Sequence, residues 1–186
     1  MEENLTQEES LIKRIVICGP ESTGKTTMIN NLSVYFQTNY VDEFARDFLQ
    51  KKWDSKKEIC SKEDLIQIAK GQIKAENIKI KNSNKLIFCD TNILTTLAWS
   101  RTHFDEFCDP WLEKQSKLLT YDYYLILNTD IPWVKDDLRD RPKDRKKMFL
   151  AHKKELDNLN VDYDIINGSD FEKRFNKALE YIKNKY

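Results

Sequence analysis

The sequence predicts an α/β fold in which a mostly parallel sheet is covered by helices on both faces. Short apolar runs alternate along the chain with longer segments whose apolar residues recur at helical spacing. Such alternation is typical of strands joined by crossover helices. With 186 residues, the chain has the size of one domain, which we expect to span residues 1–186.

The first elements flank a glycine-containing loop. Residues 14–18 form a short β-branched run that ends at Gly19, and residues 25–36 place apolar groups at helical spacing. Residues 40–44 predict the tip of a second strand. The lysine-rich stretch 51–62 then predicts a solvated connection.

The remaining elements continue the alternation. Residues 61–64 (SKED) resemble a capping box, and apolar residues from Leu65 onward share one face of the helix that follows. The run 85–90 (KLIFCD) is too short for a helix and too apolar for a loop, so it predicts a buried parallel strand. We expect a helix over 91–101 and another that begins at Asp109-Pro110. Strands are expected over 123–127 and 161–166, and a closing helix after Gly168.

Charge and composition limit the class of protein. Lys+Arg and Asp+Glu both count 31, so no net charge favours nucleic acid or an anionic membrane as a partner. No apolar run approaches the roughly 18 residues that span a bilayer, and the polar residues 1–10 predict a flexible tail rather than a signal peptide. We therefore expect a cytoplasmic protein. The four cysteines lack CxxC spacing, which indicates neither a disulfide framework nor a zinc site.

The strongest motif is a phosphate-binding loop. Residues 19–26 (GPESTGKT) match G-x-x-x-x-G-K-[ST] in full, with the strand before and the helix after that this motif requires. Backbone N–H groups at the helix N-terminus would hold the phosphates of ATP, and Lys25 would bridge the β- and γ-phosphates. The Thr26 hydroxyl would ligate Mg²⁺. The ATP-binding residues expected here are Gly19, Glu21, Ser22, Thr23, Gly24, Lys25, Thr26 and Thr27, with Asn167, Gly168 and Arg174 as candidates for the adenine side.

Two carboxylate positions extend this prediction. Asp90 ends an apolar strand, where a Walker-B-type carboxylate reaches Mg²⁺; the alternative is a helix N-cap. Glu43 and Arg46 follow the second strand at the sheet edge where open α/β folds bind ligands. Glu43 can accept a proton from an acceptor hydroxyl, with Asp42 as a competing base, and Arg46 can hold Glu43 or a phosphate. The alternative is a solvated i,i+3 ion pair.

An arginine cluster predicts a lid. The chain has 7 arginines against 24 lysines, yet Arg139, Arg141 and Arg145 lie within seven residues. Their planar guanidinium groups suit phosphate oxygens, so residues 134–147 would close over ATP and steady the transferring phosphoryl group. We expect Arg139 and Arg141 to be catalytic and Arg145 to contact ATP. The alternative is a solvated charged helix.

Several segments together resemble one family. They are GPESTGKTT (19–27), EFAR (43–46), AKGQ (69–72), FCDTN (88–92) with Thr95 and Thr96, DIPWV (130–134) and LRD (138–140). The chain thereby resembles the nicotinamide riboside kinase domain of bifunctional bacterial NadR proteins, in a standalone form without their DNA-binding and adenylyltransferase domains. The resemblance implies a five-stranded parallel sheet with a lid. It also implies the reaction of ATP with nicotinamide riboside to give nicotinamide mononucleotide and ADP, with Glu43 as base or ribose ligand.

The acceptor site follows from the chemistry of that substrate. Nicotinamide riboside is a pyridinium cation, and aromatic faces hold cations, so Phe44, Trp99 and Trp133 are candidates, although each can equally be a core residue. Gln72 can pair with an amide. The full set of expected acceptor-binding residues is Asp42, Glu43, Phe44, Arg46, Gln72, Asp90, Trp99 and Trp133.

The lid departs from the family pattern at two positions. The segment that usually reads PWVDDGLRD has Lys135 and Asp137 here, which changes the charge and the flexibility of the lid.

Two alternative functions remain open. The same motifs also suit a kinase of another nucleoside or of a nucleoside monophosphate. A regulatory NTP-binding module, which would hydrolyse slowly whatever the acceptor, is the third possibility.

Overall fold

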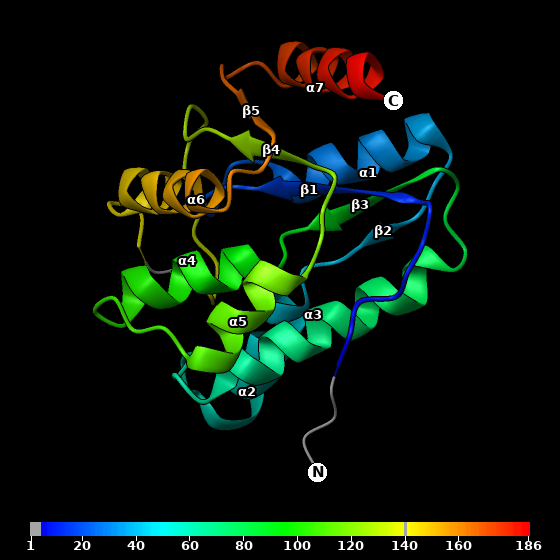
Figure 1. Cartoon of the computed structure of the whole chain (residues 1–186). Helices are drawn as coiled ribbons and strands as arrows, with labels where there is room; N and C mark the ends of the chain where they lie inside the picture. The colour runs from blue at the N-terminus through cyan, green and yellow to red at the C-terminus, as the bar shows by residue number, and fades with distance from the viewer. Residues whose placement is uncertain (1–4, 140) are drawn as a thin grey trace.

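The computed structural model describes residues 5–139 and 141–186, so residues 1–4 of the expected tail and Asp140 of the expected lid lie outside the described residues. The five strands form one parallel sheet with the order β2-β3-β1-β4-β5, which confirms the predicted fold class (Figure 1). The strands are β1 (Lys13–Cys18), β2 (Tyr40–Val41), β3 (Leu86–Asp90), β4 (Tyr123–Leu127) and β5 (Tyr163–Ile166).

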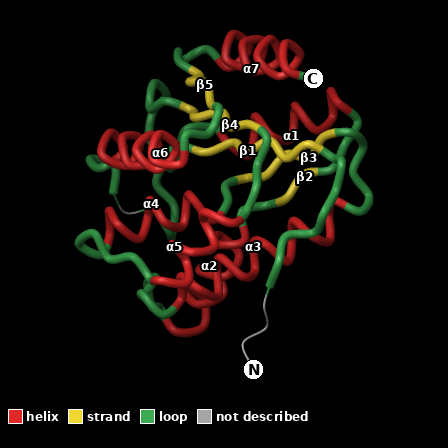
Figure 2. Tube along the Cα trace, in the orientation of Figure 1, coloured by secondary structure: helices red, strands yellow, loops and turns green. Residues whose placement is uncertain are grey.

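Helices cover the sheet on both faces, and Figure 2 shows the strands as one layer between them. Ile15 and Ile17 of β1 pack in the cluster that includes α1 and α7, whereas Val16 and Cys18 pack in the cluster on the opposite face. This alternation follows from the two-residue period of a strand. None of the helices in the described ranges has the combined length and apolarity needed to cross a membrane. The helices are α1 (Lys25–Phe36), α2 (Phe44–Lys56), α3 (Asp64–Ile80), α4 (Ile93–His103), α5 (Pro110–Leu118), α6 (Arg145–Leu159) and α7 (Phe171–Lys185).

The prediction of a solvated connection over residues 51–62 is wrong for its first half, because α2 runs through it as far as Lys56. Apolar residues of α2 (Phe44, Phe48, Leu49 and Trp53) recur at helical spacing, but none is fully buried, and the lysines of its second half resemble a solvated connection. The helix ends where Lys57 adopts a left-handed conformation with φ 55°. The connection itself is therefore short, and α2 brings the residues after β2 over the sheet edge.

Helix α4 begins two residues later than predicted. Thr91 has φ 65°, which is incompatible with a helix, and the Asn92 side chain accepts hydrogen bonds from the N–H groups of Leu94 and Thr95. Asn92 is therefore the N-cap, and the alternative role of Asp90 as a helix cap is excluded.

Residues 5–10, expected as part of a flexible tail, make specific contacts. The Gln7 amide exchanges two hydrogen bonds with the Thr120 main chain, at 3.0 and 2.9 Å. The Glu8 N–H donates to Asn77 at 2.7 Å, and Asn77 in turn donates to the Thr6 carbonyl at 2.8 Å. This segment is thereby held between α3 and the loop that leads to β4.

The placement of α2 on α3 depends on Gly71. A Cβ atom built on Gly71 would lie 2.1 Å from the Phe44 ring, so the ring occupies the space that a side chain would need. We expect Gly71→Ala to destabilise the fold by about 1–3 kcal/mol through overpacking. Because Gly→Ala within a helix otherwise stabilises by about 0.5–1 kcal/mol, the sign of the change in urea unfolding is decisive. Gln67→Ala on an exposed position of α3 is the matched control, and an unchanged or higher unfolding midpoint for Gly71→Ala contradicts this packing.

Candidate active site

A cavity of about 560 Å³ opens at the carboxyl edge of the sheet. Open α/β sheets bind their ligands at this edge. The phosphate loop forms one end of the cavity, and α2, α3, α4, the lid segment and α6 form the rest of its wall. Residues from the phosphate loop, the segment after β2, α3, α4 and the arginine cluster therefore meet around one space, whereas none of residues 130–134 belongs to its described wall.

The phosphate loop adopts a conformation that its glycines permit. Gly19 has φ 135°, and a Cβ atom there would lie 2.6 Å from the Leu127 carbonyl oxygen of the neighbouring strand β4. Gly24 has φ 82° and precedes the first turn of α1. The Thr23 hydroxyl donates to the Pro20 carbonyl at 2.8 Å and closes the loop. The N-terminus of α1, which carries about half a positive charge, therefore faces the cavity.

Lys25, Thr26 and Asp90 meet at the phosphate end. Lys25 Nζ donates to the Pro20 carbonyl at 3.0 Å, and the Thr26 hydroxyl donates to Asp90 Oδ2 at 2.7 Å. Asp90 is only 2% exposed. Burial, together with the negative charge of Glu43, raises the pKa of Asp90 to about 6, although Lys25 and the Thr26 hydroxyl act in the opposite direction.

This arrangement suits Mg²⁺. Asp90 Oδ1 is buried and has no hydrogen-bond partner among the described residues, so it is an acceptor without a donor beside the Thr26 hydroxyl. Mg²⁺ is usually held by one or two protein oxygens together with phosphate oxygens and water. The described residues hold no group of three or more His, Cys, Asp or Glu side chains that could bind a metal alone. The donor set therefore fits an ion that is bound jointly with a nucleotide.

Glu43 and Arg46 lie on the cavity wall at the start of α2. Asp42 is exposed and is not one of the described residues that form this wall. The alternative of an i,i+3 ion pair between Glu43 and Arg46 is not what the structure shows: Arg46 Nη2 lies 2.6 Å from Asp136 Oδ2, in the lid segment. The geometry therefore favours Glu43 over Asp42 as the group that faces a ligand.

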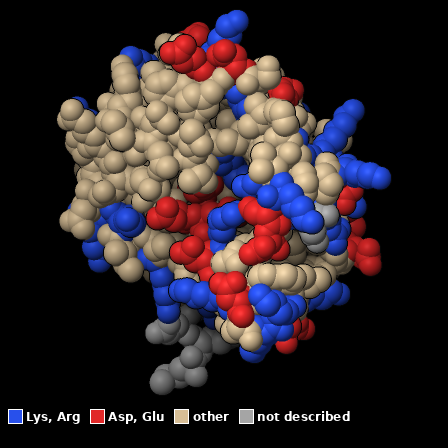
Figure 3. Space-filling model, turned by 180° about the vertical axis from the view of Figure 1, so that it is seen from behind, with Lys and Arg blue, Asp and Glu red and all other residues tan. Residues whose placement is uncertain are grey.

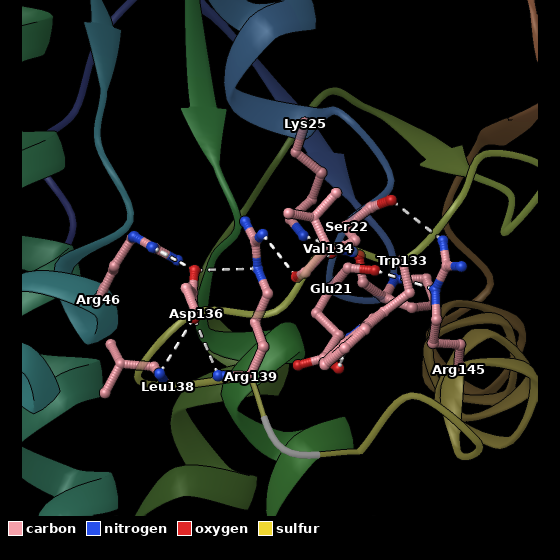
Figure 4. Close-up of polar contacts among 11 residues, drawn as sticks. Glu21, Ser22, Lys25, Arg46, Trp133, Val134, Asp136, Leu138, Arg139 and Arg145 are labelled. Carbon is pink, nitrogen blue, oxygen red and sulfur yellow. Dashed lines mark hydrogen bonds and ion pairs between the residues drawn. The ribbon is translucent and has the colours of Figure 1, made fainter.

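The lid segment lies against the phosphate loop (Figure 4). The Trp133 indole N–H donates to Glu21 Oε1 at 2.5 Å, and the Val134 N–H donates to the Ser22 hydroxyl at 3.1 Å. The Arg145 guanidinium donates to three main-chain oxygens, those of Glu21 (3.1 Å), Ser22 (3.0 Å) and Ile131 (2.9 Å). Arg145, for which we expect a contact with ATP, lines the cavity, and its guanidinium joins two carbonyls of the phosphate loop to that of Ile131.

Arg139 and Arg141 also line the cavity. Arg139 Nε lies 3.2 Å from Asp136 Oδ2, and Arg141 Nη1 lies 3.9 Å from Asp144 Oδ2. The described residues of 135–144 form turns and loops, and α6 begins only at Arg145, so the alternative of a charged helix is wrong.

The predicted aromatic residues separate into two groups. Trp99 lines the cavity and stacks on His103 at a centroid distance of 3.9 Å. Phe44 and Trp133, in contrast, do not belong to the cavity wall formed by the described residues. Phe44 packs on α3 because its ring fits over Gly71, and Trp133 is held at the loop by Glu21. Gln72 lines the cavity, and its Oε1 accepts the Phe44 N–H at 2.9 Å, which fixes the start of α2.

Sequence reasoning missed the apolar end of the cavity. Its wall there includes Leu49, Trp53, Ile59, Leu65 and Phe104. Their spacing resembles that of ordinary core residues, and only the meeting of α2, α3 and α4 shows that they surround a space. The candidates Asn167, Gly168 and Arg174 for an adenine site do not line this cavity; Gly168 N donates to Asp130 at 2.7 Å.

On the face opposite to that of Figure 1, acidic and basic side chains are interleaved over the centre and lower right of the view, whereas the upper left carries few charged residues (Figure 3). This pattern accords with the equal numbers of acidic and basic residues in the sequence. Local pairs, such as Arg46 with Asp136, therefore determine the electrostatics of the site more than any overall field.

Comparisons with known proteins agree with this architecture. Residues 14–174 match the protein family described as the AAA domain. The trifunctional NAD biosynthesis/regulator protein NadR of Escherichia coli is 26% identical over 174 residues, which cover 92% of this chain and 42% of that protein. The protein of the same description from Salmonella typhimurium is also 26% identical over 174 residues. The chain thus spans less than half the length of these curated relatives.

Solved structures show the same fold. A NadR protein in complex with NR has a TM-score of 0.79 and 19% identity, and the match covers 94% of this chain and 49% of that one. A thymidylate kinase from Ehrlichia chaffeensis has a TM-score of 0.65 and 11% identity, and the match covers 92% of this chain and 98% of that one. The predicted P-loop kinase fold is therefore confirmed.

Proposed function

We propose that this chain, which belongs to the AAA domain family, is an ATP-dependent kinase that phosphorylates nicotinamide riboside to nicotinamide mononucleotide. The observation that supports this most is that the phosphate loop and Glu43 open onto one cavity, together with Arg46, Arg139 and Arg141. A site that only hydrolysed a nucleotide would not need an additional space for an acceptor. The similarity to NadR, and the solved NadR complex with NR, support the choice of acceptor.

The donor half of the reaction belongs to the phosphate loop. The N–H groups of the loop and the Lys25 ammonium would hold the β- and γ-phosphates of ATP. Thr26 and Asp90 would hold Mg²⁺, which when bound neutralises charge on the phosphate oxygens. Arg139 and Arg141 would face the same charge from the lid, because both lie on the cavity wall.

The acceptor half belongs to α2 and α4. The ribose 5′-hydroxyl oxygen would form the new bond to the γ-phosphorus, the bond from that phosphorus to the ADP oxygen would break, and Glu43 would take the hydroxyl proton. Trp99 offers an aromatic face to the pyridinium cation from the cavity wall. The apolar side chains around Trp53 and Phe104 would exclude water from this end.

The acceptor is tested by measuring ADP release with ATP, Mg²⁺ and a panel of nucleosides and nucleoside monophosphates. We expect nicotinamide riboside to have the highest kcat/KM of the panel. A preference for a monophosphate would instead assign Arg46 and Arg139 to the acceptor phosphate and overturn the proposed substrate. A slow rate that no acceptor changes would favour the regulatory module and overturn the kinase proposal.

A further inference from the structure

Asp136 connects two arginines of the candidate site. Its Oδ2 lies 2.6 Å from Arg46 Nη2, which belongs to α2, and 3.2 Å from Arg139 Nε, which belongs to the lid segment. Its Oδ1 accepts the N–H groups of Leu138 and Arg139 at 3.0 and 2.9 Å. This one carboxylate therefore accepts three hydrogen bonds, from Arg46 and from the main chain of Leu138 and Arg139, and also forms an ion pair with the Arg139 guanidinium; the turn that it caps fixes its orientation.

These contacts belong to a continuous polar chain from the phosphate loop to α2 (Figure 4). The Ser22 hydroxyl exchanges hydrogen bonds with the Val134 main chain at 3.2 and 3.1 Å. The Val134 carbonyl also accepts from Arg139 Nη1 at 3.1 Å. Asp136 then carries the chain from Arg139 to Arg46.

The charges explain why a carboxylate is needed at this position. Arg46 and Arg139 both line the cavity, whereas Asp136 is not part of the wall formed by the described residues. Two guanidinium groups that share a partner would repel each other without its negative charge. Partial burial tends to raise the pKa of Asp136, but the hydrogen bond from Arg46, the Leu138 N–H and the positive charges outweigh it, so this pKa lies below its ordinary value. The carboxylate is therefore ionised near neutral pH.

We infer that Asp136 is a positioning residue, which holds Arg46 and Arg139 on the cavity wall so that both guanidinium groups can act on the phosphoryl group or the acceptor. This inference rests on the proposed kinase function for its effect on rate. Asp136 acts through the arginines and does not touch the reacting atoms. Ion pairs as exposed as Arg46 with Asp136 add little to stability, so the consequence lies in the orientation of the arginines rather than in the fold.

Asp136→Asn tests this inference. The asparagine oxygen can still accept the Leu138 and Arg139 N–H groups, so the turn is kept while the charge is lost. We expect kcat to fall about 10-fold or more while the dissociation constant for ATP changes less than about twofold. Asp136→Glu should recover part of the loss. Asp54→Asn is the matched control, because it removes the same charge from an exposed position of α2 outside the cavity wall, where the carboxylate accepts from Gln50 at 3.0 Å rather than from an arginine, and it should leave kcat nearly unchanged.

Two further measurements separate positioning from other roles. In the double variant Asp136→Asn/Arg46→Gln, the loss of kcat should be smaller than the product of the single losses, because both changes remove the same contact. Full multiplicativity, an unchanged or raised kcat in Asp136→Asn, or a loss of ATP affinity that parallels the loss of kcat would each overturn the inference.

Solvent exchange of an arginine guanidinium, measured by NMR, tests the positioning role independently of the acceptor. The Nη–H resonances of Arg46, whose Nη2 donates to Asp136 at 2.6 Å, are assigned by their disappearance in Arg46→Lys; they should be protected from exchange in the wild type and lose that protection in Asp136→Asn. An unprotected wild-type signal, or one unaffected by Asp136→Asn, overturns the positioning role whether or not nicotinamide riboside is the acceptor. If the wild type uses another acceptor in the panel, the proposed substrate fails and the kinetic comparison is made with that acceptor.

Discussion

Lys25→Ala is expected to lower kcat for phosphoryl transfer by about 100-fold or more, which corresponds to roughly 3 kcal/mol of transition-state stabilisation. Lys25 is the first residue of α1, and its ammonium group lies at the mouth of the phosphate loop, 3.0 Å from the Pro20 carbonyl. From there it can follow the negative charge that moves from the γ-phosphoryl group to the departing ADP. Alanine at this position leaves no group that can do so.

The loss should be catalytic and not structural. The Lys25 side chain is partly exposed and does not belong to either apolar cluster, so the unfolding midpoint should remain close to that of the wild type. Lys146→Ala removes an equal charge from an exposed position beside Arg145 and should leave kcat within about threefold. A Lys25→Ala protein that is folded and has nearly wild-type kcat would contradict the role of the phosphate loop.

Glu43→Gln is expected to lower kcat by about 100-fold or more, because general base catalysis typically contributes 10²- to 10⁴-fold. Glu43 is the N-cap position of α2 and lines the cavity. Glutamine keeps the size of the side chain but cannot take the hydroxyl proton. ATP binding should be nearly unchanged, because the phosphate loop is untouched, and calorimetric titration with a non-hydrolysable ATP analogue measures this directly.

Asp42→Asn is the matched control for Glu43→Gln. Asp42 is adjacent in sequence but exposed, and it does not belong to the cavity wall of the described residues. Its replacement should change kcat by less than about threefold. If Asp42→Asn shows the larger loss, the two carboxylates have exchanged roles, and if neither variant loses activity, a side-chain base is not used.

The donor end of the site could be predicted from the sequence because its determinants are local. The conformation of residues 19–26 depends on glycines within the loop and on the strand and helix that flank it. Asp90 was also predictable, because a carboxylate at the end of a buried strand is typical of the Mg²⁺-binding position in proteins with such a loop. Its contact with the Thr26 hydroxyl confirms that the two segments meet.

The acceptor end depends on packing between distant segments, which the sequence does not reveal. Phe44 resembles a ligand-stacking residue until the helix containing Gly71 is placed beneath its ring. Trp133 likewise finds its hydrogen-bond partner, Glu21, 112 residues away in the chain. Asp136 was missed because its importance arises only when α2 brings Arg46 to the lid segment. The length of helix α2 was underestimated because the lysines of its second half resemble a solvated connection.

Identification of the products tests the central claim most directly. The protein is incubated with ATP, Mg²⁺ and nicotinamide riboside, and all products are quantified by mass spectrometry. We predict that nicotinamide mononucleotide and ADP form in equal amounts, and that neither accumulates with Lys25→Ala. Nicotinamide riboside that remains unmodified while ATP is converted to ADP and inorganic phosphate would contradict the assignment of the cavity beside Glu43 to this acceptor.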